Sequence, residues 1–114
     1  MGLSTEVKAL YKAIFADEAL EQLDNLDKVS RNKIYRGIRI FEAEGKNAQN
    51  SRDLGDIWEI KADNVRAYFD YEGNKIIIIG LIVLKKSQKA PIRFINQAKR
   101  NIEKVKQMIK KGEI

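Results

Sequence analysis

Residues 56–91, DIWEIKADNVRAYFDYEGNKIIIIGLIVLKKSQKAP, decide the fold of this chain because they predict three consecutive strands. Ile57 to Ala62 and Val65 to Tyr71 alternate apolar and polar side chains, whereas Lys75 to Leu84 is almost wholly apolar. The Asp63-Asn64 pair suits a two-residue hairpin turn, since both residue types tolerate a positive φ. The third run is too apolar for an exposed edge and predicts a central strand covered on both faces.

A two-residue turn at Asp63-Asn64 determines which side chains of the hairpin share a face. Lys61 then lies opposite Arg66, and side chains alternate between faces along each strand. The apolar face, which we expect to point into the core, consists of Trp58, Ile60, Ala67 and Phe69. The polar face consists of Glu59, Lys61, Arg66 and Tyr68. One side of the hairpin therefore gathers titratable and phosphate-binding groups.

The segment before the hairpin predicts a strand followed by two helices. Residues 5–12 alternate, which favours an opening strand, although their apolar positions also suit a helix. Asp17 is expected to cap a first short helix, and Ser30 a second helix that ends at Gly45. These two helices predict an αα-hairpin. Residues 46–55 are polar and turn-rich, so we expect a loop there.

The segment after the hairpin predicts one further helix, with Pro91 in its first turn. Its apolar stripe consists of Ile92, Ile95, Ala98, Ile102, Val105 and Ile109. Residues 85–114 carry a net charge of +8, within a chain whose net charge is +6. A basic end favours an anionic partner, which can be RNA, DNA or an acidic protein. A solvated helix surface explains the charge equally well.

The composition bounds the class of protein. A length of 114 residues fits a single domain over residues 1–114, and 44% hydrophobic residues favour a folded chain. The chain has no Cys and no His, so disulfides, thiolate metal sites and the usual neutral-pH general base are excluded. We therefore expect no metal and no other cofactor. No apolar run is long enough for a membrane span and the start lacks a secretion signal, so we expect a cytoplasmic protein with no membrane partner.

The polar hairpin face suggests RNA chemistry, because the 2′-OH of RNA can attack the adjacent phosphate. Such a reaction needs a base, an acid, and cations on the phosphate oxygens. Arg66 can bind a phosphate with two parallel hydrogen bonds, and Lys61 adds a point charge. Without His, a Glu such as Glu59 or a Lys of lowered pKa can be the base, and a Lys or a Tyr the acid. Spacing alone leaves a second interpretation open, in which these three residues form an ordinary surface ion network.

The order of these segments resembles the RelE/ParE toxin superfamily, and most closely its phage-derived HigB-type branch. The resemblance runs in order over residues 17–105. The residues that carry it are Gly45, Leu54, Trp58-Glu59-Ile60-Lys61, Val65-Arg66-Ala67-Tyr68-Phe69, the apolar run Ile76 to Leu84, and Lys85-Lys86-Ser87-Gln88-Lys89-Ala90-Pro91. Lys61 stands where this branch usually has Arg.

The resemblance implies an α+β, RelE-like fold. Its expected parts are a four-stranded, mainly antiparallel sheet, an N-terminal αα-hairpin and a C-terminal helix. It also implies the toxin of a type II toxin–antitoxin system, a metal-independent endoribonuclease that cuts mRNA on the ribosome. The expected partners are the ribosome, mRNA and a cognate antitoxin, which we expect to be a small helix-turn-helix protein; a homodimer is left open.

The resemblance and the hairpin face together give two sets of site residues. The candidate catalytic residues are Glu59, Lys61, Arg66 and Lys86. The residues expected to contact RNA are Tyr68, Lys85 and Lys89. Two alternatives stay open: a non-catalytic member that poisons DNA gyrase or binds RNA, and a protein whose basic C-terminal helix binds an acidic partner.

Overall fold

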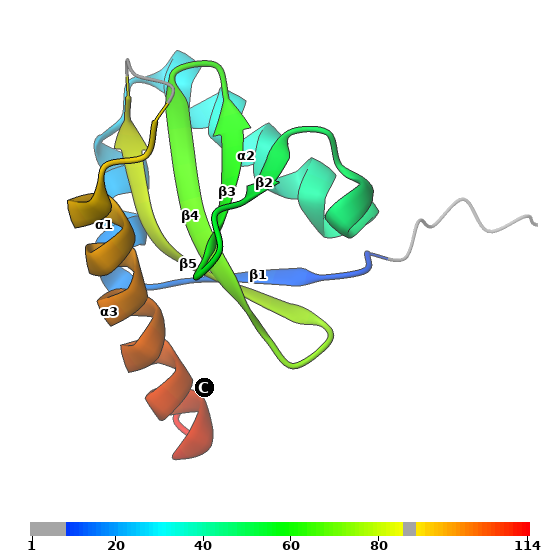
Figure 1. The fold of residues 1–114 in the computed structure, drawn as a ribbon, viewed down its shortest axis with the longest axis vertical. Helices are drawn as coiled ribbons and strands as arrows, with labels where there is room; N and C mark the ends of the chain where they lie inside the picture. Colours follow the sequence, from blue (N-terminus) through cyan, green and yellow to red (C-terminus); the bar gives the residue numbers. More distant parts are fainter. Residues whose placement is uncertain (1–8, 86–88) are drawn as a thin grey trace, which may run out of the picture.

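The computed structural model describes residues 9–85 and 89–114 and shows a five-stranded mixed sheet with helices on both faces (Figure 1). The elements in chain order are β1 (Lys12–Phe15), α1 (Asp17–Asn25), α2 (Lys28–Glu44), the 3-10 turn η1 (Gly45–Asn47), β2 (Ser51–Asp53), β3 (Trp58–Ala62), β4 (Val65–Glu72), β5 (Ile76–Leu84) and α3 (Ile92–Lys110). The strand order is β1-β5-β4-β3-β2, in which β1 runs parallel to β5 and the other pairs are antiparallel.

The β3–β4 hairpin confirms the register that the sequence predicts. Ala62 pairs with Val65, Lys61 with Arg66, and the ladder continues to Trp58 and Phe69. Asp63 adopts a φ of 59°, the left-handed conformation that a two-residue turn requires and that Asp tolerates. Because the register is as predicted, the apolar and polar faces of the hairpin are also as predicted.

The expectation of four strands in a mainly antiparallel sheet is wrong in two places. Within the predicted loop at residues 46–55, Ser51–Asp53 forms the edge strand β2 and pairs with β3. Three residues are too few for an alternating pattern to show. The opening strand lies at Lys12–Phe15 rather than at 5–12 and pairs in parallel with β5; residues 5–8 of that prediction lie outside the described residues.

The two predicted helices are confirmed as α1 and α2, but their N-caps differ from the expected ones. Ala16, without a side-chain hydrogen bond, caps α1, so Asp17 is the first helical residue. The Asp27 carboxylate accepts a hydrogen bond from the Ser30 backbone N–H and caps α2, so Ser30 lies inside the helix. Gly45 ends α2 with a φ of 63°, as its residue type predicts.

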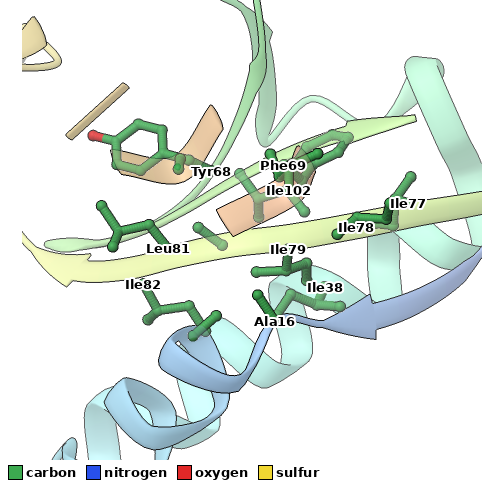
Figure 2. Packing of buried hydrophobic residues seen from close by; sticks show 14 of the residues in the cluster. Ala16, Ile38, Tyr68, Phe69, Ile77, Ile78, Ile79, Leu81, Ile82 and Ile102 are labelled. Atoms are coloured by element: carbon green, nitrogen blue, oxygen red, sulfur yellow. The ribbon is translucent and has the colours of Figure 1, made fainter. Parts of the chain in front are cut away.

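The core lies on both faces of β5, whose residues 77–82 are all buried. Helix α2 covers one face of β3 and β4, while α3 covers the opposite face of β4 and β5. Figure 2 shows Ile79 and Ile82 on the side of β5 that faces Ile38 and Ala16, and Leu81 on the side that faces Tyr68. A central strand covered on both faces is therefore confirmed.

Gly80 allows α3 to pack closely on β5. It lies at a register shift, since Tyr68 pairs with Leu81 and Phe69 pairs with Ile79. A Cβ built at Gly80 would lie 2.6 Å from the backbone oxygen of Ala98 in α3. No side chain fits at that distance, so the helix sits against bare backbone at this point.

Helix α1 covers the part of β5 that β1 does not pair with. The β1–β5 ladder ends at Phe15 and Ile79. Beyond it, the side-chain oxygen of Gln22 accepts a hydrogen bond of 2.9 Å from the Ile82 backbone N–H. A polar side chain thus satisfies a strand donor that would otherwise be unpaired at a buried edge. Within the described residues, no helix is long and apolar enough to cross a membrane.

Two isoleucines of α3 test this arrangement, because the sequence places both in the apolar stripe but only one is buried. Ile102 is 3% exposed, whereas Ile92 is 74% exposed and is a correction to the predicted stripe. Ile102→Ala should lower the free energy of unfolding by about 2–5 kcal/mol. Ile92→Ala should change it by less than about 0.5 kcal/mol. Urea denaturation measures both values, and equal losses would contradict the packing of α3.

Candidate nucleic-acid interface

The polar face of the hairpin is largely buried rather than open to solvent. Glu59 is 2% exposed, Arg66 4% and Tyr68 0%. Lys85, which directly follows β5, is 6% exposed and joins them on the same face. Burial of charged side chains is costly unless they are paired. Of the three residues in the surface ion network that the sequence left open, Glu59 and Arg66 are therefore buried and Lys61 is exposed.

Glu59 is the centre of this cluster. Its Oε1 accepts a hydrogen bond of 3.0 Å from Arg52 Nη2. Its Oε2 lies 3.5 Å from Lys85 Nζ and 3.9 Å from Arg66 Nε. One carboxylate is thus shared by three cations that come from β2, β4 and the end of β5. We call these four residues the Glu59 cluster.

The like-charged pair of Lys61 and Arg66 is separated by the direction of the Arg66 side chain. Arg66 Nη1 donates hydrogen bonds to the backbone oxygens of Val65, at 3.1 Å, and Asp63. Lys61 is exposed. The backbone oxygens and Glu59 therefore compensate the Arg66 charge, which lets the sheet tolerate this like-charged pair. The Arg66 guanidinium therefore stabilises the Asp63-Asn64 turn as well as pairing with Glu59.

Tyr68 lies inside the protein, at 6.5 Å between ring centroids from Phe94 of α3. Burial, and then the nearby Glu59 carboxylate, raise the pKa of the Tyr68 phenol well above its usual range. A buried ring is not placed to stack on a base, so its burial argues against the predicted contact between Tyr68 and RNA. Tyr68 pairs with Glu59 in the β3–β4 ladder, and its neutral phenol adds no charge to the Glu59 cluster.

Lys85 has a perturbed ammonium group. Burial lowers its pKa below the usual value for Lys; the Glu59 carboxylate opposes that shift and the Arg66 guanidinium adds to it. A lysine that releases its proton more readily is better suited to proton transfer than an exposed one. Within the described residues, three buried atoms of this region have no hydrogen-bond partner, namely Glu59 Oε2, Arg66 Nε and Tyr68 Oη.

The cluster opens into a cleft of about 390 Å³ at the end of the hairpin. Its lining consists of Gln49, Asn50, Ser51, Arg52, Glu59, Lys61, Asp63 and Arg66. The Asp63 carboxylate is 2.7 Å from Lys33 Nζ of α2, so its charge is already paired. The charge that faces the cleft is therefore predominantly positive, and an anion is the ligand that fits it.

Arg52 is the residue that sequence reasoning missed. The polar segment at 46–55 gave no sign of a strand, so nothing placed Arg52 opposite Glu59, where the β2–β3 register puts it. Half of its side chain is exposed, and it lines both the cleft and a second hollow of about 490 Å³. Lys89 lines that second hollow, together with Ala90 and Ile95. The one sequence feature that could have indicated this contact is the position of Arg52, two to three residues before the Leu54-Gly55 turn that leads into the hairpin.

The structure thus brings together Glu59, Arg66 and Lys85 and places Lys61 and Lys89, both exposed, at the rims of the two hollows. Lys86, a predicted catalytic residue, lies outside the described residues. Over residues 9–85 and 89–114, no group of three or more His, Cys, Asp or Glu residues could hold a metal ion.

Comparison with known proteins gives the family. The model of the family "Phage derived protein Gp49-like (DUF891)" matches residues 21–103. The chain belongs to this Gp49-like family. The matched segment runs from α1 to α3 and includes the whole Glu59 cluster. A search of curated proteins finds no match.

One solved structure shows that this Gp49-like chain has a RelE-like fold. One chain of the archaeal RelE–RelB complex from Pyrococcus horikoshii OT3 superposes with a TM-score of 0.56 at 16% identity, covering 71% of this chain and 99% of that chain. The toxin–antitoxin complex RelBE2 from Mycobacterium tuberculosis gives 0.47 at 14% identity, covering 69% and 95%. The predicted α+β, RelE-like class is confirmed, with five strands rather than four.

The buried phenol of Tyr68 makes stability depend on pH in a defined way. Because its pKa is raised in the folded protein, the folded state keeps the phenol neutral, while the unfolded chain ionises near pH 10. The hydroxyl therefore costs stability progressively as the pH rises above about 10. Tyr68→Phe should gain stability over the parent protein between pH 9 and pH 11.

Urea unfolding at both pH values measures this difference, with Tyr35→Phe as the control because Tyr35 is exposed on α2. A constant difference between the parent and Tyr68→Phe across this range would contradict the burial of the phenol beside Glu59.

Proposed function

We propose that this protein is the toxin of a type II toxin–antitoxin pair and cuts mRNA on the ribosome without a metal. The observation that carries the proposal is the Glu59 cluster, which opens into a cationic cleft on a RelE-like sheet. A cleft with excess positive charge suits a phosphodiester, and the buried carboxylate and lysine suit proton transfer to and from it. A HigB-type specificity is the finer part of the proposal, because the chain comes from a phage-derived family.

The proposed reaction is a transfer within the RNA strand. The 2′-oxygen attacks the adjacent phosphorus while Glu59 accepts the 2′-OH proton. The bond from phosphorus to the 5′-oxygen breaks, and Lys85 donates a proton to that oxygen. The products are a 2′,3′-cyclic phosphate and a 5′-OH. The lowered pKa of Lys85 favours its part in this step.

The remaining candidate residues are proposed to bind the RNA and to stabilise the negative charge on its phosphate. Arg52, Lys61 and Arg66 lie where they can balance the charge that develops on the phosphate oxygens. Lys89 is proposed to contact the RNA strand at the second hollow, and Lys86 to bind phosphate next to Lys85. Tyr68 is proposed as a positioning residue: its neutral phenol lies beside Glu59, the proposed general base, and excludes water there.

The proposed partners follow from the same function. We propose that the ribosome presents the mRNA and that the protein acts in the cytoplasm. The structural neighbour from Pyrococcus horikoshii is a RelE–RelB complex, which supports an antitoxin as the partner of this chain. We propose a small helix-turn-helix antitoxin. A homodimer of the toxin stays an open part of the proposal.

Two cations of the cleft test the function: the exposed Lys61, with the least damage to the fold, and the half-exposed Arg52, which also pairs with the buried Glu59. Lys61→Met and Arg52→Met should each reduce growth arrest on induction and the yield of new mRNA 5′ ends, about 10-fold or more, because each removes one phosphate contact. Lys99→Met is the matched control, since Lys99 is exposed on α3 and pairs with Asp56 at 3.0 Å. Growth arrest by both cleft variants equal to that of the control would refute the assignment of the cleft.

A second candidate function is inhibition by binding alone. The absence of His from all 114 residues favours it, because the usual proton-transfer group is missing. If the protein poisons gyrase, induction should give DNA cleavage complexes and an SOS response while mRNA stays intact. If it only binds RNA, growth arrest should occur with neither cleaved mRNA nor damaged DNA. Mapping mRNA ends and assaying DNA breaks in the same culture separates the three outcomes.

A further inference from the structure

Arg52 occupies an unusual position, because it joins a buried carboxylate to an open cleft. Its guanidinium bonds Glu59 Oε1, which belongs to a side chain 3% exposed, while the Arg52 side chain itself is 51% exposed. It comes from β2, an edge strand of three residues. A side chain on a short edge strand can reorient at lower cost than the side chains of Arg66 and Lys85, which are buried in the sheet.

The charges of the Glu59 cluster do not balance. One carboxylate faces three cations, and Lys61 adds a fourth at the wall of the cleft. The other acid of the lining, Asp63, is paired with Lys33. A site with surplus positive charge favours a second anion.

We infer that Glu59 acts as an internal substitute for the substrate phosphate, and that a phosphodiester in the cleft takes Arg52 from Glu59. Lys61, which also lines the cleft, binds the same phosphate, while Arg66 and Lys85 keep Glu59 in place. The identity of the phosphodiester as RNA rests on the proposed function. The exchange itself needs only a phosphate group, which Arg recognises with paired hydrogen bonds.

The exchange also explains how a buried, engaged carboxylate can become a base. While Arg52 is bound, Glu59 Oε1 is engaged as the acceptor of a charged hydrogen bond. When the phosphate takes Arg52, Oε1 loses that donor next to the bound phosphodiester. The substrate thereby activates the group that acts on it, and an empty site stays inactive.

The test is the affinity of the purified chain for inorganic phosphate. Glu59→Gln keeps the shape of the side chain but removes the competing charge, so phosphate should bind about three- to tenfold more tightly than in the parent protein. Asp56→Asn is the matched control, since it makes the same change in net charge at an exposed ion pair with Lys99. Its affinity should change by less than about twofold. Weaker phosphate binding by Glu59→Gln would overturn the inference, because it would mean that Glu59 holds Arg52 in place for the phosphate.

A second measurement on the unaltered protein guards against loss of folding in Glu59→Gln. The NMR signal of Arg52 Nε–H should shift as phosphate is added, while that of Arg66 shifts little. A shift at Arg66 with Arg52 unchanged would overturn the exchange. Both measurements use phosphate alone, so they test the Arg52 exchange separately from mRNA cleavage. The exchange can be confirmed in a protein that cuts no mRNA, and it can be refuted in one that does.

Discussion

The buried Glu59 carboxylate is the constraint on which the rest of the site depends. It neutralises part of the charge of Arg52, Arg66 and Lys85, which come from three different elements. Removing one partner from a buried ion pair typically costs about 3–5 kcal/mol, because the remaining charge stays buried. Without Glu59, the end of β5 and the start of β4 would place two buried cations beside each other. The carboxylate therefore supports both the sheet edge and the cationic cleft.

The position of the Glu59 cluster depends on the packing of two helices against the sheet, α3 at Gly80 and α2 on the apolar side of the hairpin. Gly80 lets α3 pack against β5, and this places Phe94 over Tyr68, directly behind Glu59. On the opposite face, α2 packs on the apolar side of the hairpin and holds the Asp63 turn through Lys33. The two helices thus pack against opposite faces of the hairpin, and the cleft lies at its outer end, beside β2.

Much of this arrangement was predictable from sequence where a strong local rule applied. The Asp63-Asn64 turn determined the register of the hairpin, and this register places Glu59, Lys61 and Arg66 on the same face. The apolar run before Leu84 predicted a central strand, and Gly45 predicted the end of α2. Each rests on backbone geometry or period-two alternation, which a single sequence reveals.

The rest depends on contacts between segments distant in sequence, which no local pattern reports. Nothing near Arg52 indicates that a three-residue strand places it opposite Glu59. The hairpin pattern shows that Tyr68 shares a face with Arg66, but not that α3 buries this part of the face. Ile92 follows the helical period of its stripe, yet it begins α3 beyond the sheet and stays exposed. Burial by a later element is thus the property that sequence reasoning misjudged.

The central claim is that the Glu59 cluster promotes attack by a 2′-OH, and the ends of the RNA fragments test it most directly. A translating ribosome complex can carry an mRNA whose nucleotide at the cleavage point has either a 2′-OH or a 2′-H. The account predicts 5′-OH and 2′,3′-cyclic phosphate ends from the first message and no cleavage of the second. Fragments with 5′-phosphate ends, or equal cleavage of the 2′-deoxy message, would contradict it.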